Sequence, residues 1–242
     1  MIGATRTDPA LAKKCVILQP SYIPWRGYFH QIREADTFVF YDDVAFDIRG
    51  WRNRNRIRGP NGSFWLTIPV KSKGVRSGGV RINEVEIDWS RDWTRKHWRS
   101  LVSSYAGTPF FEDYRELLQS LYRRRDRLLV ELLIDSTQAI SHRLGILDTK
   151  FLRSSSMSVS GSRSGRLLAI AQQLGADRYL TGPSARNYLD EDLFRSAGVE
   201  IEYFRYDYPP YEQRFAGFDP QVSILDLLFM TGPDAPRYIW AK

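Results

Sequence analysis

The chain has 242 residues, of which 43% are hydrophobic and 14% aromatic, so it can bury a full core and is not a disordered protein. Its net charge of +7 favours an anionic partner, which can be a phosphorylated small molecule, a nucleic acid or an anionic surface. The single cysteine excludes an internal disulfide, and no apolar run reaches the roughly 20 residues of a membrane span. We therefore expect a cytoplasmic protein that is not embedded in a membrane, while the oligomeric state stays open.

The first ordered stretch is expected after a flexible N-terminal segment, residues 1–14. An apolar run at Cys15–Leu18 is followed by a turn-rich segment at Gln19–Gly27 and a helix-like segment at Tyr28–Ala35. A second apolar run, Thr37–Tyr41, ends on the pair Asp42-Asp43. Strand, loop, helix and strand in this order predict a βαβ unit with two parallel strands.

The carboxyl ends of these two strands are the expected site. Ligands of open parallel sheets bind there, and both Gln19–Arg26 and Asp42-Asp43 follow a strand. We expect Asp42 or Asp43 to act as a base, bind a metal or orient a ligand hydroxyl, with His30 as a further catalytic candidate or a structural histidine. Adjacent strand residues point to opposite sides, so at most one of the two carboxylates should face the ligand. The expected contacts in the first loop are Gln19, Pro20, Tyr22, Trp25 and Arg26, with the aromatic rings stacking on the ligand or closing the core.

Residues 48–88 have the pattern of an antiparallel insertion. From Trp51 the chain alternates, which places Arg52, Arg54, Arg56 and Arg58 on one strand face. A turn at 59–62 leads to a returning strand at 63–70, then to a basic loop at 71–79 and another alternating strand at 80–87. Asn53 and Arg54 are the expected ligand contacts, although a solvated strand face is the alternative for the arginine row.

Residues 90–146 are expected to be mainly helical. Ser90 is a plausible N-cap for a helix that ends before Gly107, and a longer helical region at 112–144 is expected to break near Asp135-Ser136. The remainder alternates helix and strand again, with strands at 176–182 and 199–206 and a C-terminal helix at 223–230. We predict a single α/β domain over 15–242, with a parallel-sheet core, helices on both faces, the hairpin insertion and the helical middle segment.

Two later loops carry polar side chains suited to anions. The segment 158–165 enters a helix, where Ser162, Arg163 and Arg166 would form a phosphate seat, with an ordinary N-cap as the alternative. The segment 181–188 follows a strand and supplies Ser184, Arg186 and Asn187 as further substrate contacts.

Several chemistries have no pattern in this sequence. The three histidines and one cysteine do not have zinc-ligand spacing, so we assign no metal site from them, and a metal requirement stays open. There is no G-x-S-x-G motif, and no G-x-G-x-x-G follows a strand, which argues against nicotinamide or flavin chemistry. Cys15 lies inside an apolar strand and is a poor nucleophile.

Six blocks in order resemble the signature of the WbqC-like family over residues of roughly 15 to 232: QPSYIPWRGYF, ADTFVFYDDVAF, WRNRNRI, WLTIPV, TGPSARNYL and SILDLLF. The family is found among genes for bacterial surface polysaccharides and specialised metabolites. The resemblance implies an enzyme that joins an acyl or aminoacyl unit to an amine of a nucleotide-linked sugar or related metabolite. Arg26, Arg54 and Arg186 would then hold phosphate or carboxylate.

The first unit also resembles nucleotidylyl-transferase folds such as pantothenate synthetase, which would imply ATP or a nucleotide-linked substrate. Gly27 matches the glycine of their His-x-Gly-His motif, but Arg26 and Tyr28 stand at the histidine positions, so the proton donor is missing. The alternatives to acyl transfer are therefore a nucleotidylyl transferase and a basic nucleic-acid-binding protein, whose affinity would fall steeply with salt.

Overall fold

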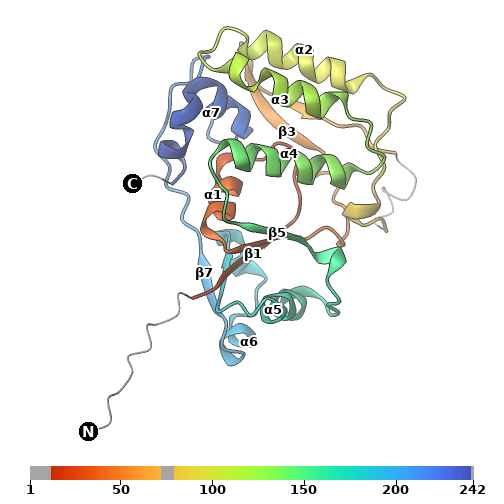
Figure 1. Ribbon diagram of the computed structural model, residues 1–242, viewed down its shortest axis with the longest axis vertical. Coiled ribbons are helices and arrows are strands. Elements are labelled where there is room, and N and C mark those ends of the chain that lie inside the picture. The colour runs from red at the N-terminus through yellow and green to blue at the C-terminus, as the bar shows by residue number, and fades with distance from the viewer. Residues whose placement is uncertain (1–11, 72–78, 241–242) are drawn as a thin grey trace.

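The computed structural model describes residues 12–71 and 79–240, which form a five-stranded parallel sheet, a separate two-stranded hairpin and seven α-helices (Figure 1). This confirms the expected α/β class. The flexible start at 1–14 and the basic loop at 71–79 fall largely outside the described residues. The sheet has the order β5-β2-β1-β6-β7, from Lys150–Arg153, Thr37–Phe40, Lys14–Leu18, Arg178–Thr181 and Glu200–Tyr203.

The strand order reverses between β1 and β6. From β1 the chain runs through helix α1 (Arg26–Glu34) to β2 and then outward to β5. It returns across the sheet to β6, on the other side of β1, and ends at β7. In doubly wound sheets such a reversal opens a crevice at the carboxyl ends of the strands.

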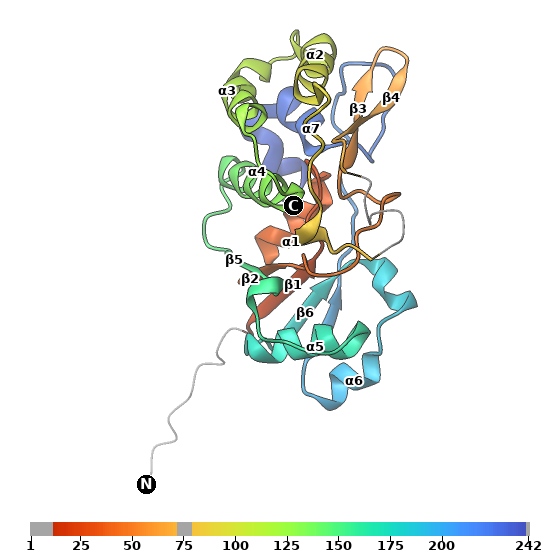
Figure 2. The same ribbon diagram turned by 90° about the vertical axis from the view of Figure 1, so that its right-hand side faces the viewer.

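Strand residues alternate between two hydrophobic cores. Val16, Phe38 and Leu180 belong to the larger core, which includes α1 and the helices of the middle segment. Cys15 and Val39 belong to the smaller core, which α5 (Arg163–Gln173) and α6 (Glu191–Ser196) cover on the opposite face (Figure 2). Near-continuous apolar strands are what a parallel sheet buried on both faces requires.

The long segment between β2 and β5 builds the far end of the molecule. It contains the hairpin of β3 (Arg54–Gly59) and β4 (Gly62–Thr67) and three helices. In both ribbon views the hairpin, α2 and α3 lie together with the C-terminal helix α7, away from α5 and α6. The bounds of these helices are Trp93–Tyr105 for α2, Phe111–Arg123 for α3, Leu129–Arg143 for α4 and Ile224–Thr231 for α7.

Four local expectations differ from the structure. Residues 80–87 form a 3₁₀ turn at Ile82–Glu84 with isolated bridges instead of a strand, and the helical region breaks at 124–128 instead of near Asp135. The cause is shared, because the amide of Ile87 donates to the carbonyl of Arg127 and that of Leu129 donates to Val85. This pairing draws both segments out of regular structure. Strand β5, Lys150–Arg153, lies directly before a serine-rich run and is not among the expected strands, and the N-cap of α2 is Asp92, two residues beyond Ser90.

None of the helices in the described ranges combines the length and the apolar character needed to cross a bilayer.

Candidate functional site

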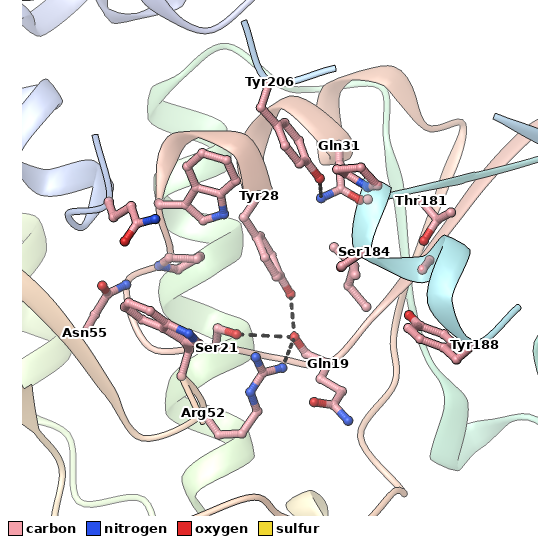
Figure 3. A pocket seen from close by; sticks show the side chains of 18 residues that line it. Gln19, Ser21, Tyr28, Gln31, Arg52, Asn55, Thr181, Ser184, Tyr188 and Tyr206 are labelled. Carbon is pink, nitrogen blue, oxygen red and sulfur yellow. Dashed lines mark hydrogen bonds between the residues drawn. The ribbon is translucent and has the colours of Figure 1, made fainter. Parts of the chain in front are cut away.

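A cavity of about 460 Å³ opens at the reversal point of the sheet (Figure 3). Its walls come from the loops that follow β1 and β6, from α1, and from the segment that leads into β3. Tyr206 and Gln221, from the segment after β7, complete the lining. The cavity therefore lies where a doubly wound sheet binds its ligand.

The loop between β1 and α1 is fixed around one carbonyl group. The carbonyl oxygen of Gln19 accepts hydrogen bonds from Tyr28 Oη and Arg52 Nη1, both at 3.2 Å, and from Ser21 Oγ at 3.5 Å (Figure 3). The donors come from the loop itself, from α1 and from the segment before β3. The wall of the cavity at Gln19 is therefore held from three directions.

The same loop contains a strained residue. Ile23 has φ of 35°, a conformation that a β-branched side chain rarely adopts and that costs about 1–3 kcal/mol. Asn55, buried on β3, compensates by donating from Nδ2 to the carbonyls of Tyr22 at 3.1 Å and Ile23 at 2.8 Å. The hairpin thus holds the loop in its shape, which explains why β3 carries a buried amide.

Gly27 is required by the wall of the cavity. A Cβ atom at this position would lie 2.3 Å from Cζ2 of Trp25, so any other residue would displace the indole. Trp25 is the N-cap residue of α1, and its ring meets that of Tyr206 edge-on, with centroids 4.9 Å apart. The glycine therefore lets an aromatic side chain fold over the first turn of the helix and line the site.

The cavity lining carries positive charge at one end. Arg52 is the only charged side chain among the described residues that line it. Burial lowers the pKa of this guanidinium, while Tyr28 and Asp47 oppose that effect. Within the described ranges no carboxylate lies within ion-pair distance of Arg52, and its hydrogen bond goes to the neutral carbonyl of Gln19. A partly buried cation whose acidic neighbour Asp47 is not in direct contact with it favours an anionic ligand.

Gln31 and Tyr206 lie at the other end of the cavity. Gln31 Nε2 donates to Tyr206 Oη at 2.9 Å, and burial raises the pKa of Tyr206 to about 12, so the phenol is protonated at neutral pH. Thr181 and Gly182, directly after β6, line the same region. The arrangement offers neutral hydrogen-bonding groups at one end and a cation at the other.

The structure brings some of the predicted residues into this cavity and leaves others outside it. Gln19, Trp25 and Ser184 line it, and they come from the two loops expected at the sheet edge. Pro20 is buried in the first loop without lining the cavity.

Asp42 and Asp43 lie beside the cavity's sheet edge but do not line it. Asp42 is fully buried and accepts hydrogen bonds from Arg153 Nε at 2.8 Å and from the amide and hydroxyl of Ser155 at 3.0 and 2.8 Å. Asp43 accepts from Ser154 Oγ at 2.6 Å and pairs with Arg166. Burial by itself would raise the pKa of Asp43, but the bonds from Arg166 and Ser154 hold it below its usual range.

Three further candidates are buried supports. Tyr22 Oη lies 2.9 Å from His97 Nδ1 and 2.7 Å from Tyr122 Oη. Arg26 donates from Nη1 to the carbonyls of Pro209 at 2.9 Å and Tyr238 at 3.1 Å, and Asn53 donates to the carbonyl of Ile68 at 2.8 Å. These side chains form hydrogen bonds within the folded chain and do not line the cavity.

The remaining candidates lie on other surfaces. His30 Nδ1 is 2.9 Å from Tyr208 Oη, Arg54 stacks on Trp65, and Arg186 stacks on Tyr203 with its guanidinium 3.9 Å from the ring centre. Asn187 and the start of α5, with Ser162 and Arg163, are exposed and away from the cavity, and Arg166 is engaged with Asp43. Within the described part of the chain, no three His, Cys, Asp or Glu side chains gather into a metal site.

The sequence did not identify the residues at the two ends of the cavity, Arg52, Gln31 and Tyr206, as candidates for the site. Arg52 was visible only as one member of an alternating arginine row, and Gln31 is a polar residue on a helix, which carries no signal. Tyr206 lies in a strand-like stretch 175 residues from Gln31. Only the folded chain shows that these three side chains face one cavity.

Two comparisons with known proteins identify relatives of this chain. The family model described as the WbqC-like protein family matches residues 19–238. The chain is 40% identical over 229 residues to a protein of Mycobacterium tuberculosis (strain ATCC 25618 / H37Rv) named uncharacterized protein Rv1507c, which covers 94% of this chain and 97% of that one. No solved structure matches the chain.

Proposed function

The chain belongs to the WbqC-like protein family, and we propose that it is a group-transfer enzyme whose reversal-point cavity binds an anionic, ring-bearing metabolite. The reaction would join an acyl or aminoacyl unit to an amine of a nucleotide-linked sugar or a related metabolite. The single observation that carries the proposal is Arg52, a partly buried guanidinium with no carboxylate within ion-pair distance among the described residues. An anionic ligand would supply a counterion in direct contact.

The aromatic walls support the ring-bearing part of the ligand. Trp25, Tyr28 and Trp51 line the cavity from three different segments. Such rings bury large areas and stack on planar or apolar ring faces. A cavity that combines aromatic walls with few, well-placed polar groups is typical of small-molecule sites.

The chemistry would rely on positioning. In acyl transfer the amine nitrogen attacks the carbonyl carbon, the bond to the leaving group breaks with its electron pair, and the nitrogen loses one proton. Among the described residues of the lining there is no carboxylate or imidazole to take that proton. The amine would therefore enter neutral, the donor would be an activated acyl group, and the leaving group, departing with the bonding electron pair, would take the proton from the nitrogen. The fixed geometry of the Gln19 loop would supply orientation, and Arg52 would stabilise developing negative charge.

A second candidate, binding of single-stranded nucleic acid, is favoured by one surface feature. Trp51 and Trp65 are 40% and 43% exposed, their ring centroids are 4.9 Å apart, and Arg54 lies over Trp65. Exposed aromatic rings with arginines can stack bases. Nucleic-acid affinity would fall steeply as salt is raised, and an absence of binding at low salt would remove this candidate.

The test of the enzyme proposal uses Arg52→Gln, with the exposed Arg49→Gln as the matched control. A thermal-shift screen with nucleotides, nucleotide sugars and aminoacyl donors should find ligands that raise the melting temperature of the wild type. Loss of a charge-assisted contact of about 1.5–3 kcal/mol predicts a loss of affinity of about ten- to 150-fold for Arg52→Gln and none for Arg49→Gln. Equal affinity in the two variants would contradict an anion site at Arg52.

A further inference from the structure

Gln31 has an unsatisfied polar atom at the inner end of the cavity. The side chain is only 4% exposed, it lines the cavity, and its Oε1 is shielded from water without a hydrogen-bond partner. A buried acceptor without a donor costs about 1–3 kcal/mol. Native proteins leave few such groups, so each one needs a reason.

Within the described chain, Tyr206 has an unused hydrogen-bond donor that complements the unused acceptor of Gln31. Its hydroxyl oxygen accepts the hydrogen bond from Gln31 Nε2, and no described residue accepts the hydrogen of that hydroxyl. Because the phenol stays protonated, this hydrogen is available to a ligand. Gln31 and Tyr206 therefore present one acceptor and one donor side by side.

This conclusion holds for either orientation of the amide. If the Gln31 amide is turned by 180°, Tyr206 donates to Oε1, and Nε2 becomes the unused donor beside the phenolic oxygen as the acceptor. The two orientations exchange the roles of the two side chains. In both, the pair offers one donor and one acceptor to whatever fills the inner end.

We infer that Gln31 and Tyr206 read the edge of a nucleobase. Such an edge carries a donor next to an acceptor, as in N3–H and C4=O of uracil or the amino group and N1 of adenine. Trp25, edge-on to Tyr206, and Tyr28 supply ring surfaces beside it. Figure 3 shows Gln31 and Tyr206 at one end, Arg52 at the other and Tyr28 between them, so a base at the inner end would leave the phosphate near Arg52.

The inference rests on the proposed function, since it identifies the ring-bearing anion as a nucleotide. Gly182 adds a geometric condition. A Cβ atom there would lie 3.0 Å from Tyr206 Oη, so the glycine leaves room for the hydroxyl at the inner end.

Calorimetric titration with UMP, AMP and ribose 5-phosphate tests the inferred recognition of the base. The analogues 3-methyl-UMP and N6,N6-dimethyl-AMP are titrated beside them, because their bases lack the hydrogen-bond donor of the Watson–Crick edge. The wild type should bind at least one nucleotide about tenfold more tightly than its methylated analogue and than ribose 5-phosphate. Gln31→Met and Tyr206→Phe should remove that preference and leave ribose 5-phosphate binding unchanged. The controls Gln172→Met on α5 and Tyr114→Phe on α3 should behave as the wild type.

The melting temperature of the ligand-free protein separates recognition from a structural role. Gln31→Met removes the unsatisfied acceptor, so its melting temperature should equal or exceed that of the wild type while nucleotide affinity falls. Equal binding of a nucleotide and its methylated analogue, or an unchanged preference in both variants, would overturn the inference. If ribose 5-phosphate binds through Arg52 and no nucleotide binds more tightly, the inferred recognition of the base is wrong, but the proposed anion site at Arg52 is retained. If neither ribose 5-phosphate nor a nucleotide binds, the proposed anion site is wrong as well.

Discussion

Two polar clusters lie at the carboxyl edge of the same sheet, and they differ in whether their hydrogen bonds are complete. Around Asp42, after β2, the acceptor oxygens are met by Arg153, Ser154 and Ser155. In the cavity after β1 and β6, among the described residues, Arg52 forms no direct ion pair with a carboxylate and Gln31 Oε1 has no hydrogen-bond donor. A complete network needs no ligand, whereas an incomplete one is completed by a ligand, so the second cluster is the better candidate for binding.

The largest expected effect would come from breaking the complete cluster. Asp42→Asn removes a fully buried charge that pairs with Arg153, which should lower the free energy of unfolding by about 3 kcal/mol. For a chain of this size that corresponds to a fall in melting temperature of about 6–12 °C. The exposed Asp148→Asn should change it little.

Measuring ligand binding by the Asp42→Asn variant below the melting temperature of that variant tests whether the cluster around Asp42 takes part in binding. We expect affinity to be retained, because Asp42 does not line the cavity. A variant that folds with wild-type stability and loses turnover would instead return Asp42 to the role of base.

A second complete network predicts the pH dependence of stability. Burial lowers the pKa of His97 from 6.5 to about 4, and the neutral ring accepts from Tyr22 and donates to the carbonyl of Thr67. Because the folded-state pKa is depressed, the unfolded state binds the extra proton first as the pH falls below 6.5. This stabilisation is present above pH 6.5 and is lost as the pH approaches 4.

The loss attributable to His97 should reach about 2 kcal/mol at pH 5 relative to pH 8. Denaturant unfolding of the wild type and of His97→Gln across this range measures it, with the exposed His142→Gln as the control. The dependence should flatten in His97→Gln alone. An equal slope in all three proteins would show that His97 is not the group that titrates.

The smallest expected effect concerns the incomplete cluster. Gly182→Ala would bring a methyl group to about 3.0 Å from Tyr206 Oη and push the hydroxyl from its position beside Gln31. Its φ of −74° suits alanine, so we expect less than about 1 kcal/mol of change in stability and a several-fold loss of nucleotide affinity. Gly165→Ala, where a Cβ meets open space, is the control. Unchanged affinity in Gly182→Ala would argue against a ligand at this end.

Much of the architecture could be read from local patterns. Apolar runs predicted β1, β2, β6 and β7, and the Gly-Pro-Asn-Gly turn predicted the β3–β4 hairpin. Strand β5 could not be found in this way, since the four residues Lys150–Arg153 are too short a pattern and form a strand by pairing with β2. Residues 80–87 and 124–128 likewise take their form from each other.

The sequence by itself determined the α/β class, the parallel unit at β1 and β2, and the sheet edge where a site would lie, because these follow from local periodicity and from the direction of parallel strands. The tertiary structure alone decided which polar groups at that edge find partners. Asp42 meets Ser154 across 112 positions and Gln31 meets Tyr206 across 175, and such contacts leave no local pattern. Whether a polar residue supports the fold or faces a ligand depends on those distant partners.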